Sequence, residues 1–287
     1  MSEATQPSAG MTHISDTALW VAVYRARESE RPDAAFRDPY ARALAGGRGE
    51  QIASATPFSE QNEWSFLGRT WLFDKYIQQE VEAGADLVLN LACGLDTRPY
   101  RMALPASLHW VEVDFPGLLE YKEQILNAAG AKPACGFQRI ALDLGERDAR
   151  KALFSELGSR SGRAIVLTEG LLIYLTREEN AALADDLAAQ SSFRRWIIDS
   201  CSPGLLKMMK QAMGDRVASM PFRFAPEEGL AFYEGHGWKR LAVESMPEGA
   251  AEINRLPDFM KPFVNVPVPD PPGDNIWGGV ALLGRDY

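Results

Sequence analysis

Two short apolar runs, each followed by residues that could bind a nucleotide, carry the clearest chemical signal in the sequence. The first run, Leu87–Leu91, breaks into a turn of small residues containing Gly94, where a backbone without a Cβ atom can approach a ligand closely. The second run, residues 108–113, is followed by Asp114, an acid that could accept hydrogen bonds from ribose hydroxyl groups. This order is typical of nucleotide-binding α/β sheets, although the dinucleotide motif G-x-G-x-x-G is absent. An ordinary strand-to-loop turn remains the alternative.

The elements that would position these residues alternate between strand and helix from residue 86 onward. Such alternation predicts a parallel sheet with right-handed crossover connections. The predicted strands span residues 87–91, 108–113, 136–141, 164–168 and 196–200, and the predicted helices between them span about 117–129, 148–157 and 177–189.

Helices also dominate the segment before the first strand. The pattern predicts a helix over 17–30, a short helix after Pro39 that stops at Gly46, a loop over 47–57 and an aromatic-rich helix over 60–82. A nucleotide-binding sheet does not require these helices. Residues 16–85 are therefore predicted to form a helical cap over the mouth of the site, and residues 1–15 a disordered tail.

The end of the chain indicates a particular kind of sheet. A sixth strand over 238–244 and a seventh over 276–283 are joined by a proline-rich loop with no predicted helix, so the seventh strand should insert antiparallel. A seven-stranded, mostly parallel sheet with strand 7 reversed resembles the class I, Rossmann-like fold of S-adenosylmethionine (SAM) dependent methyltransferases. Residues 86–287 are thus predicted to form a SAM-binding α/β domain, with insertions at 201–222 and 245–275 that help form the substrate pocket.

Composition narrows the class of protein and its partners. The chain of 287 residues has a net charge of −9, which disfavours nucleic-acid binding through phosphate neutralisation. No apolar run approaches the ~20 residues of a membrane-spanning helix. The three scattered cysteines form neither a metal-binding pattern nor a disulfide framework, so we expect a cytoplasmic protein without a metal site. We also expect a monomer or homodimer that binds no nucleic acid and no membrane.

Five motifs occur in one order and carry a family resemblance. Together they resemble the leucine carboxyl methyltransferase family, in its bacterial branch of SAM-dependent O-methyltransferases. The resemblance is close over about residues 15–200 and loose beyond, where family members with protein substrates dock their partner, so we do not expect a protein C-terminus as substrate. The motifs are residues 17–26, 36–40, Asn-Leu-Ala-Cys-Gly-Leu-Asp-Thr-Arg at 90–98, Val-Glu-Val-Asp-Phe-Pro at 111–116, and Thr-Glu-Gly-Leu-Leu-Ile-Tyr-Leu at 168–175.

The resemblance implies a position around SAM for each matching residue. Arg69 would pair with the SAM carboxylate through its planar guanidinium, and Glu169 would lie near the SAM ammonium group. Asp114 would accept the ribose hydroxyls, with capping of the following helix as an alternative that is compatible with this role. Asp143 and Leu144 would flank the adenine. The other implied cofactor-binding residues are Ala92 and Gly94 in the turn, Phe115 after the second strand, and Arg25, for which Arg27 is the alternative.

The predicted reaction is in-line transfer of the sulfonium methyl group to an oxygen, a carboxylate of a small, partly hydrophobic molecule. A carboxylate is ionised at neutral pH and needs no general base, which fits a sequence without an obvious Ser/His/Asp or Cys/His constellation. A phenol or alcohol acceptor is the alternative and would need a base, such as His13 or His236. The residues predicted to orient the acceptor are Tyr24, Tyr174 and Arg223, together with Arg25 and Arg27.

Two other classes of function stay open at this point. A non-catalytic SAM-binding module would have the same signature, because methyl transfer needs no diagnostic catalytic residue. An NAD-dependent oxidoreductase would share the sheet, but the missing second and third glycines of the turn count against it.

Overall fold

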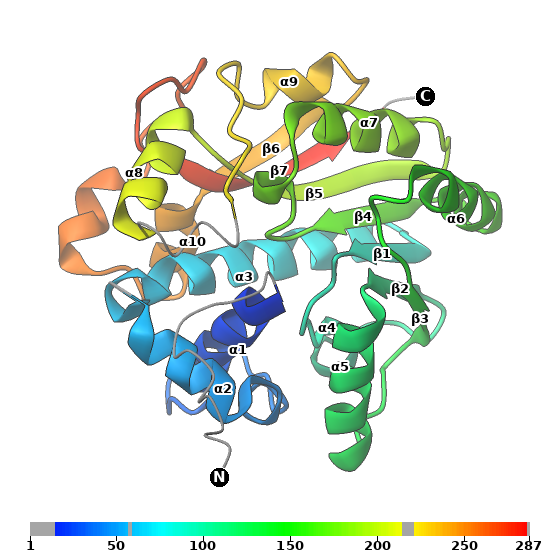
Figure 1. Ribbon diagram of the computed structural model, residues 1–287, viewed down its shortest axis with the longest axis horizontal. Helices are drawn as coiled ribbons and strands as arrows, with labels where there is room; N and C mark the ends of the chain where they lie inside the picture. Colours follow the sequence, from blue (N-terminus) through cyan, green and yellow to red (C-terminus); the bar gives the residue numbers. More distant parts are fainter. Residues whose placement is uncertain (1–14, 57–58, 214–220, 286–287) are drawn as a thin grey trace, which may run out of the picture.

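The computed structural model describes residues 15–56, 59–213 and 221–285 (Figure 1). The tail predicted over 1–15, apart from its last residue, and His13 therefore lie outside the described residues. Within the described ranges, no helix combines the length and the apolar character needed to cross a bilayer.

A seven-stranded sheet forms the centre of the protein, in the order β3-β2-β1-β4-β5-β7-β6. Strands β1 to β5 are parallel, and β7 pairs antiparallel with β5 and β6, which confirms the predicted reversal of the seventh strand. The strand order reverses between β1 and β4, the kind of switch point at which open α/β sheets bind ligands. The strands are β1 (Leu87–Leu91), β2 (His109–Asp114), β3 (Gly136–Ala141), β4 (Ala164–Thr168), β5 (Phe193–Cys201), β6 (Lys239–Ser245) and β7 (Gly278–Gly284).

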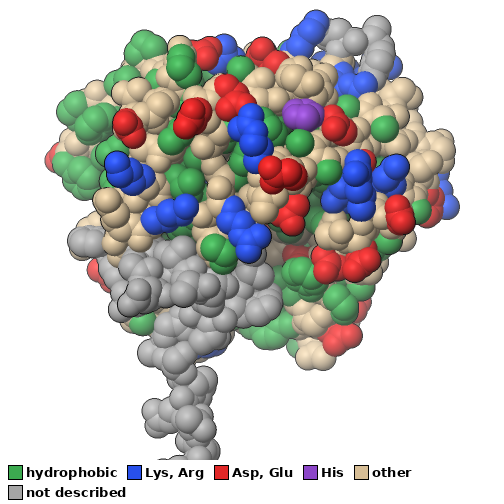
Figure 2. Space-filling model, turned by 45° about the horizontal axis from the view of Figure 1, so that its top comes forward, with side chains coloured by type: hydrophobic (Ala, Val, Ile, Leu, Met, Phe, Trp, Pro, Cys, Tyr) green, Lys and Arg blue, Asp and Glu red, His purple; other side chains and the backbone are tan. Residues whose placement is uncertain are grey.

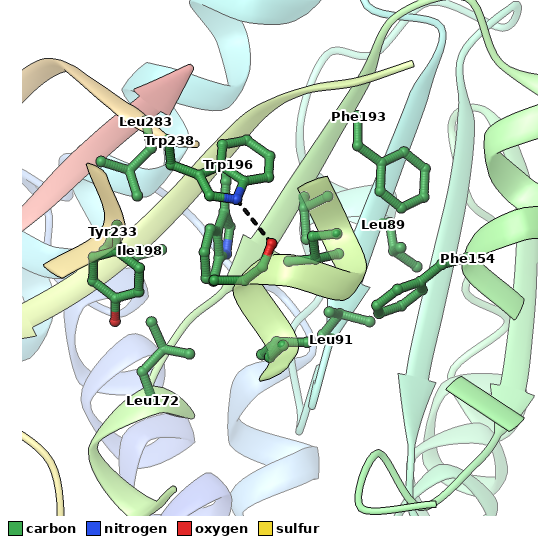
Figure 3. Packing of buried hydrophobic residues seen from close by; sticks show 14 of the residues in the cluster. Leu89, Leu91, Phe154, Leu172, Phe193, Trp196, Ile198, Tyr233, Trp238 and Leu283 are labelled. Carbon is green, nitrogen blue, oxygen red and sulfur yellow. Dashed lines mark hydrogen bonds between the residues drawn. The ribbon is translucent and has the colours of Figure 1, made fainter. Parts of the chain in front are cut away.

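Both faces of the sheet are buried, which explains why its central strands are continuous apolar runs. Successive side chains alternate between two cores, so Leu89 of β1 packs on one face and Val88 on the other. On the face of Leu89, the Trp196 ring lies 5.2 Å from Tyr233 and 5.3 Å from Trp238, measured between ring centroids (Figure 3). This packing fixes the sheet and hence the positions of the strand ends.

Helices α6 and α7 cover the face of Leu89, whereas α3 covers the face of Val88 (Figure 1). Phe73 and Ile77, in the second half of α3, belong to this layer and are fully buried. The segment 16–85 therefore completes the core of the sheet in addition to any role as a cap. The helices are α1 (Ser15–Ser29), α2 (Ala41–Ala55), α3 (Ser59–Glu82), α4 (Arg98–Arg101), α5 (Pro116–Ala128), α6 (Arg147–Arg160), α7 (Arg177–Ala188), α8 (Pro203–Met213), α9 (Ala231–Glu234) and α10 (Met246–Glu252), with 3-10 helices η1 (Leu172–Tyr174) and η3 (Asp258–Phe263).

The prediction of a loop over residues 47–57 is wrong, because α2 continues to Ala55. Gly46 breaks the helix with φ 55° and ψ −173°, as expected for glycine, but the helical conformation resumes after it. The resumed part buries Ile52 against Leu19 and Trp20 of α1. Tertiary packing therefore restores a helix that the local sequence predicts to end at Gly46.

The connection between β6 and β7 was predicted to lack a helix, and this is also wrong, since α10 and η3 occupy it. Ser245 and Glu248 form a capping box, in which each side chain accepts a hydrogen bond from the other residue's backbone N–H. Helix α10 packs tightly on α3, since a Cβ atom on Gly68 would lie 2.6 Å from the carbonyl oxygen of Met246. The short Ser245-Met246-Pro247-Glu248 pattern was the signal that could have revealed this helix.

Candidate functional site

A cavity of about 1050 Å³ lies over the carboxyl ends of β1, β2, β4 and β5, at the switch point of the sheet. Typical small-molecule pockets measure about 300–1,000 Å³, so this one has room for a nucleotide-sized ligand and a second molecule. Its wall has two chemically different parts. We call them the polar end, with Arg69, Asp96, Arg98, Asp114, Glu169 and Asp199, and the apolar end, with Leu205, Met208, Met209, Phe259, Met260, Phe263, Val266 and Ile276.

The turn after β1 brings backbone close to the polar end. Ala92 and Gly94 both have positive φ, at 52° and 51°. For alanine this conformation is uncommon and costs free energy, and such strained residues concentrate at functional sites. A Cβ atom on Gly94 would lie 3.3 Å from the Cβ atom of Ala18 in α1, so a larger residue would crowd the space between turn and helix. The turn therefore presents backbone rather than side chains to the cavity.

Asp114 ends β2 with its carboxylate against this turn. Its Oδ2 accepts a hydrogen bond from the Gly94 N–H at 2.7 Å, and its Oδ1 accepts one from the Phe115 N–H at 2.7 Å. Burial raises the pKa of Asp114, and these two amide bonds act in the opposite direction. Each carboxylate oxygen keeps a further lone pair for a ligand in the cavity. The alternative capping role is wrong, because Phe115 occupies the N-cap position of α5.

Arg69 of α3 reaches the polar end between two acids from different strands. Its Nε lies 3.1 Å from Oε1 of Glu169, and its Nη1 lies 3.0 Å from Oδ2 of Asp199. The other oxygen of Asp199 accepts a hydrogen bond from the Gly170 N–H at 2.8 Å. Burial raises the pKa of Asp199, whereas Arg69 lowers it. Asp199 therefore ties α3 to the ends of β4 and β5.

Arg98 extends this network along the polar end. Its Nη1 lies 2.7 Å from Oε2 of Glu169 and 3.0 Å from Oδ2 of Asp96, and its Nε lies 2.6 Å from Oδ1 of Asp74. Although burial would raise the pKa of Asp96, the charge of Arg98 contributes most to lowering it, to about 2. Arg101 also pairs with Asp74, so the network contains three arginines and four carboxylates. The excess of one negative charge favours a ligand that carries positive charge.

Two further predicted residues lie in the cavity wall. Tyr174 of η1 lines the cavity, and burial raises its pKa to about 12, so its hydroxyl stays protonated and can donate a hydrogen bond at physiological pH. Arg25 pairs with Asp38, with Nε to Oδ2 at 2.9 Å, and donates from Nη2 to the carbonyl oxygen of Leu95 at 2.6 Å. Arg25 therefore holds α1 against the turn after β1.

Tyr24 and Arg223 do not line the cavity. Tyr24 is fully buried behind the wall, where its hydroxyl accepts a hydrogen bond from Trp20 Nε1 at 2.6 Å. Arg223 is exposed, whereas its neighbours Phe222 and Phe224 are buried and line the cavity, so the alternation of this segment directs Arg223 to the opposite side. The structure therefore gives neither residue the acceptor-orienting position predicted for it.

Asp143 and Leu144 also lie outside the cavity wall. Asp143 is exposed and accepts a hydrogen bond from the Gly145 N–H at 2.8 Å, and Leu144 packs against the core of the sheet. Their role beside adenine stays a prediction. Arg27 pairs with Glu50 away from the cavity, so Arg25 is the arginine of α1 that lies at the site.

His236, a predicted alternative base, pairs with Asp185 at 2.7 Å between Nδ1 and Oδ1 and does not line the cavity. Across the part of the chain that the structure describes, no group of three or more His, Cys, Asp and Glu side chains could hold a metal ion.

Sequence reasoning missed Asp199 and gave no role to Arg98. Arg98 ends the recognised Gly-Leu-Asp-Thr-Arg motif, so its presence was visible but its three acidic partners were not. Asp199 follows an apolar run near the end of β5, and an acid at the end of a buried strand was the available signal.

Comparison with known proteins identifies relatives of this chain. The leucine carboxyl methyltransferase family matches residues 18–188. A candidate S-adenosyl-L-methionine-dependent methyltransferase of Parafrankia sp. is 31% identical over 260 residues, which cover 86% of this chain and 83% of that protein. One of Streptomyces coelicolor is 32% identical over 264 residues, covering 88% and 91%. The crystal structure of a candidate methyltransferase from Thermobifida fusca covers 100% of both chains with a TM-score of 0.55 at 14% identity, which confirms the fold class.

Proposed function

This chain belongs to the leucine carboxyl methyltransferase family and is a SAM-dependent methyltransferase, and on that premise we propose that it methylates a carboxylate oxygen of a small, partly hydrophobic molecule. SAM supplies an electrophilic methyl group bound to a positively charged sulfur. The observation that carries the proposal is the division of one cavity into a charged end and an apolar end. This division provides separate places for a polar cofactor and a less polar acceptor.

The polar end fits SAM in charge and shape. The turn at Ala92 and Gly94 offers backbone to a close ligand, and Asp114 keeps lone pairs for ribose hydroxyls. Arg69 could hold the SAM carboxylate in two parallel hydrogen bonds after a small rearrangement of its acidic partners. The excess negative charge of the network suits the ammonium and sulfonium groups. These assignments account for every charged group of the ligand.

The rest of the cavity suits an acceptor that is already ionised. The described cavity wall contains neither histidine nor lysine, and its four acids are already engaged. Asp96, Glu169 and Asp199 pair with Arg69 or Arg98, and Asp114 accepts hydrogen bonds from two backbone amides. An acceptor that needs no general base fits this wall better than a phenol or an alcohol. Tyr174 could donate a hydrogen bond to one carboxylate oxygen and leave the other free to attack. Catalysis would then come from orienting that oxygen in line with the methyl group and excluding water.

The pH dependence of kcat/KM distinguishes a carboxylate from a phenol. With a carboxylic acid, kcat/KM should be constant from pH 7 to 9, because a carboxylate is ionised well below this range and the Tyr174 pKa of about 12 lies above it. With a phenol of pKa ≈ 10, kcat/KM should rise about tenfold per pH unit as phenolate accumulates. The measurement is S-adenosylhomocysteine (SAH) formation, with SAH affinity measured at each pH as a control. A tenfold rise per pH unit with carboxylic acids would contradict the proposal.

Replacing Arg69 by methionine tests the proposed contact with the SAM carboxylate. We expect SAH to bind about tenfold more weakly. Hydrogen bonds to charged groups contribute ~1.5–3 kcal/mol, and part of this lost binding free energy is recovered when Glu169 and Asp199, the partners of Arg69, relax. 5′-Methylthioadenosine lacks the amino-acid group and should bind with unchanged affinity. Calorimetric titration of both ligands measures the difference.

Arg27→Met is the matched control for Arg69→Met, because Arg27 is ion-paired with Glu50 outside the cavity. Its affinity for both ligands should equal that of the wild type. Equal weakening of SAH and methylthioadenosine by Arg69→Met would indicate a general disturbance of the site and would remove the assigned contact.

A further inference from the structure

Strongly exposed large hydrophobic side chains gather around the cavity. Seven such side chains occur in the described part of the chain, between 42% and 65% exposed, and six of them line the cavity wall. Leu241 on β6 is the seventh and lies elsewhere. Single exposed hydrophobic residues are normal on a protein surface, but a cluster around a concave site marks a binding surface. The six are Phe115, Met208, Phe259, Phe263, Val266 and Ile276.

Five of these side chains form one border of the cavity. Met208 comes from α8, and the other four come from η3 and the segment that leads to β7; we call these five the apolar rim (Met208, Phe259, Phe263, Val266 and Ile276). Figure 2 shows hydrophobic side chains gathered at the left edge of the face in view, on the side where Figure 1 places α8 and the connection from α10 to β7. Elsewhere on that face acidic and basic side chains are mixed.

The apolar surface continues from the rim into the cavity. Leu205, Met209 and Met260 line the wall next to rim residues along the chain. Methionine side chains are flexible and adapt to ligands of irregular shape. An apolar path therefore leads from the solvent to the region where β5 ends.

Charged groups are confined to the other end of the cavity. The cationic residues of the described wall are Arg25, Arg69 and Arg98. Arg69 and Arg98 are ion-paired within the polar end, and Arg25 is ion-paired with Asp38 beside the turn after β1. The acids of the described wall also belong to the polar end. The described apolar path thus offers no charge to a second ionic group on an acceptor, and burying such a group there would be costly.

From these observations we infer that the acceptor is an amphiphilic monoacid with an extended apolar body that reaches the apolar rim. The inference rests on the proposed function, because it places the reacting carboxylate at the inner end of the path. Each methylene group buried on the way out adds binding free energy, so the rim determines preference for chain length. Short acids and acids with a second charge are poor ligands.

Binding of straight-chain acids to the SAH-loaded protein tests the inference without requiring methyl transfer. In a series from butanoate to dodecanoate, the dissociation constant should fall about fourfold per added methylene and then level off when the chain passes the rim. In the double variant Phe259→Ser, Phe263→Ser, the total increase in affinity from butanoate to dodecanoate should be about tenfold smaller than in the wild type. SAH should bind this variant as tightly as the wild type, which shows that the polar end is intact.

Leu241→Ser is the matched control, because it removes an equally exposed hydrophobic side chain outside the cavity. It should leave the chain-length series unchanged. An affinity independent of chain length, or equal losses in Leu241→Ser and in the double variant, would overturn the inference.

A parallel series of alcohols separates this inference from the proposed function. If acids are methylated equally well at every chain length, the proposed function stands and the inference about the rim fails. If acids and alcohols both bind more tightly with length but only alcohols are methylated, the rim inference stands and the carboxylate proposal fails.

Discussion

Replacing Arg98 by methionine is expected to lower the free energy of unfolding by about 3–5 kcal/mol, the usual cost of removing one partner from a buried ionic network. The Arg98 side chain is 3% exposed and lies between Asp74, Asp96 and Glu169. Without it, Asp96 loses its main cationic partner and Glu169 keeps only Arg69. Urea denaturation followed by circular dichroism measures this change, provided that the m-value stays constant.

Arg160→Met provides the comparison for Arg98→Met. Arg160 pairs with Glu156 on the surface of α6, with side chains 65% and 51% exposed, so its loss should change the free energy of unfolding by less than about 0.5 kcal/mol. A loss for Arg98→Met no larger than this would show that the network is not required for stability. Arg98→Lys should be intermediate, because an ammonium group is a compact charge and cannot reach three carboxylates as a guanidinium does.

Replacing Asp114 by alanine is expected to weaken SAM and SAH binding by about 30- to 100-fold. The variant loses the acceptor for ribose hydroxyls, and hydrogen bonds to charged groups contribute ~1.5–3 kcal/mol. It also leaves the N–H groups of Gly94 and Phe115 without their partner, so the turn that faces the cofactor loses its anchor. Calorimetric titration with SAM and SAH, at a temperature below the unfolding transition of the variant, measures the affinity.

Methylthioadenosine should be affected by Asp114→Ala as strongly as SAH, because both ligands contain the ribose. Arg69→Met, in contrast, should weaken the binding of SAH but not of methylthioadenosine. Together the two variants therefore test which residue contacts the ribose and which contacts the amino-acid group of the cofactor. Asp148→Ala, on the exposed first turn of α6, should leave both affinities unchanged. Wild-type affinity in Asp114→Ala would remove the ribose assignment.

Local patterns in the sequence predicted most of the sheet. The apolar runs at β1 and β4 matched the observed strands, since a parallel strand buried on both faces is recognisable without knowledge of its neighbours. The reversal of β7 was also predicted, although the connection before it contains α10. Helix α2 was cut short, because Gly46 is a real break and only the packing of Ile52 on α1 shows that the helix resumes.

The candidate site was predicted only in part, because its residues come from distant parts of the chain. Arg69 and Asp199 are 130 positions apart and meet only because α3 covers the sheet beside the end of β5. Tyr24 and Arg223 were plausible by residue type, but burial of one and the outward direction of the other keep them from the cavity. Residue type and motif order do not specify such directions.

The sequence by itself therefore determined the family, the cofactor and a mostly parallel sheet with the seventh strand reversed, because each depends on short contiguous motifs and on apolar periodicity. The tertiary structure decided which charges pair, which side chains face the cavity, and that the exposed hydrophobic residues of α8, η3 and the segment before β7 share one border. These features depend on how helices and loops pack on the sheet. Contacts between residues distant in sequence, rather than local propensity, decide that packing.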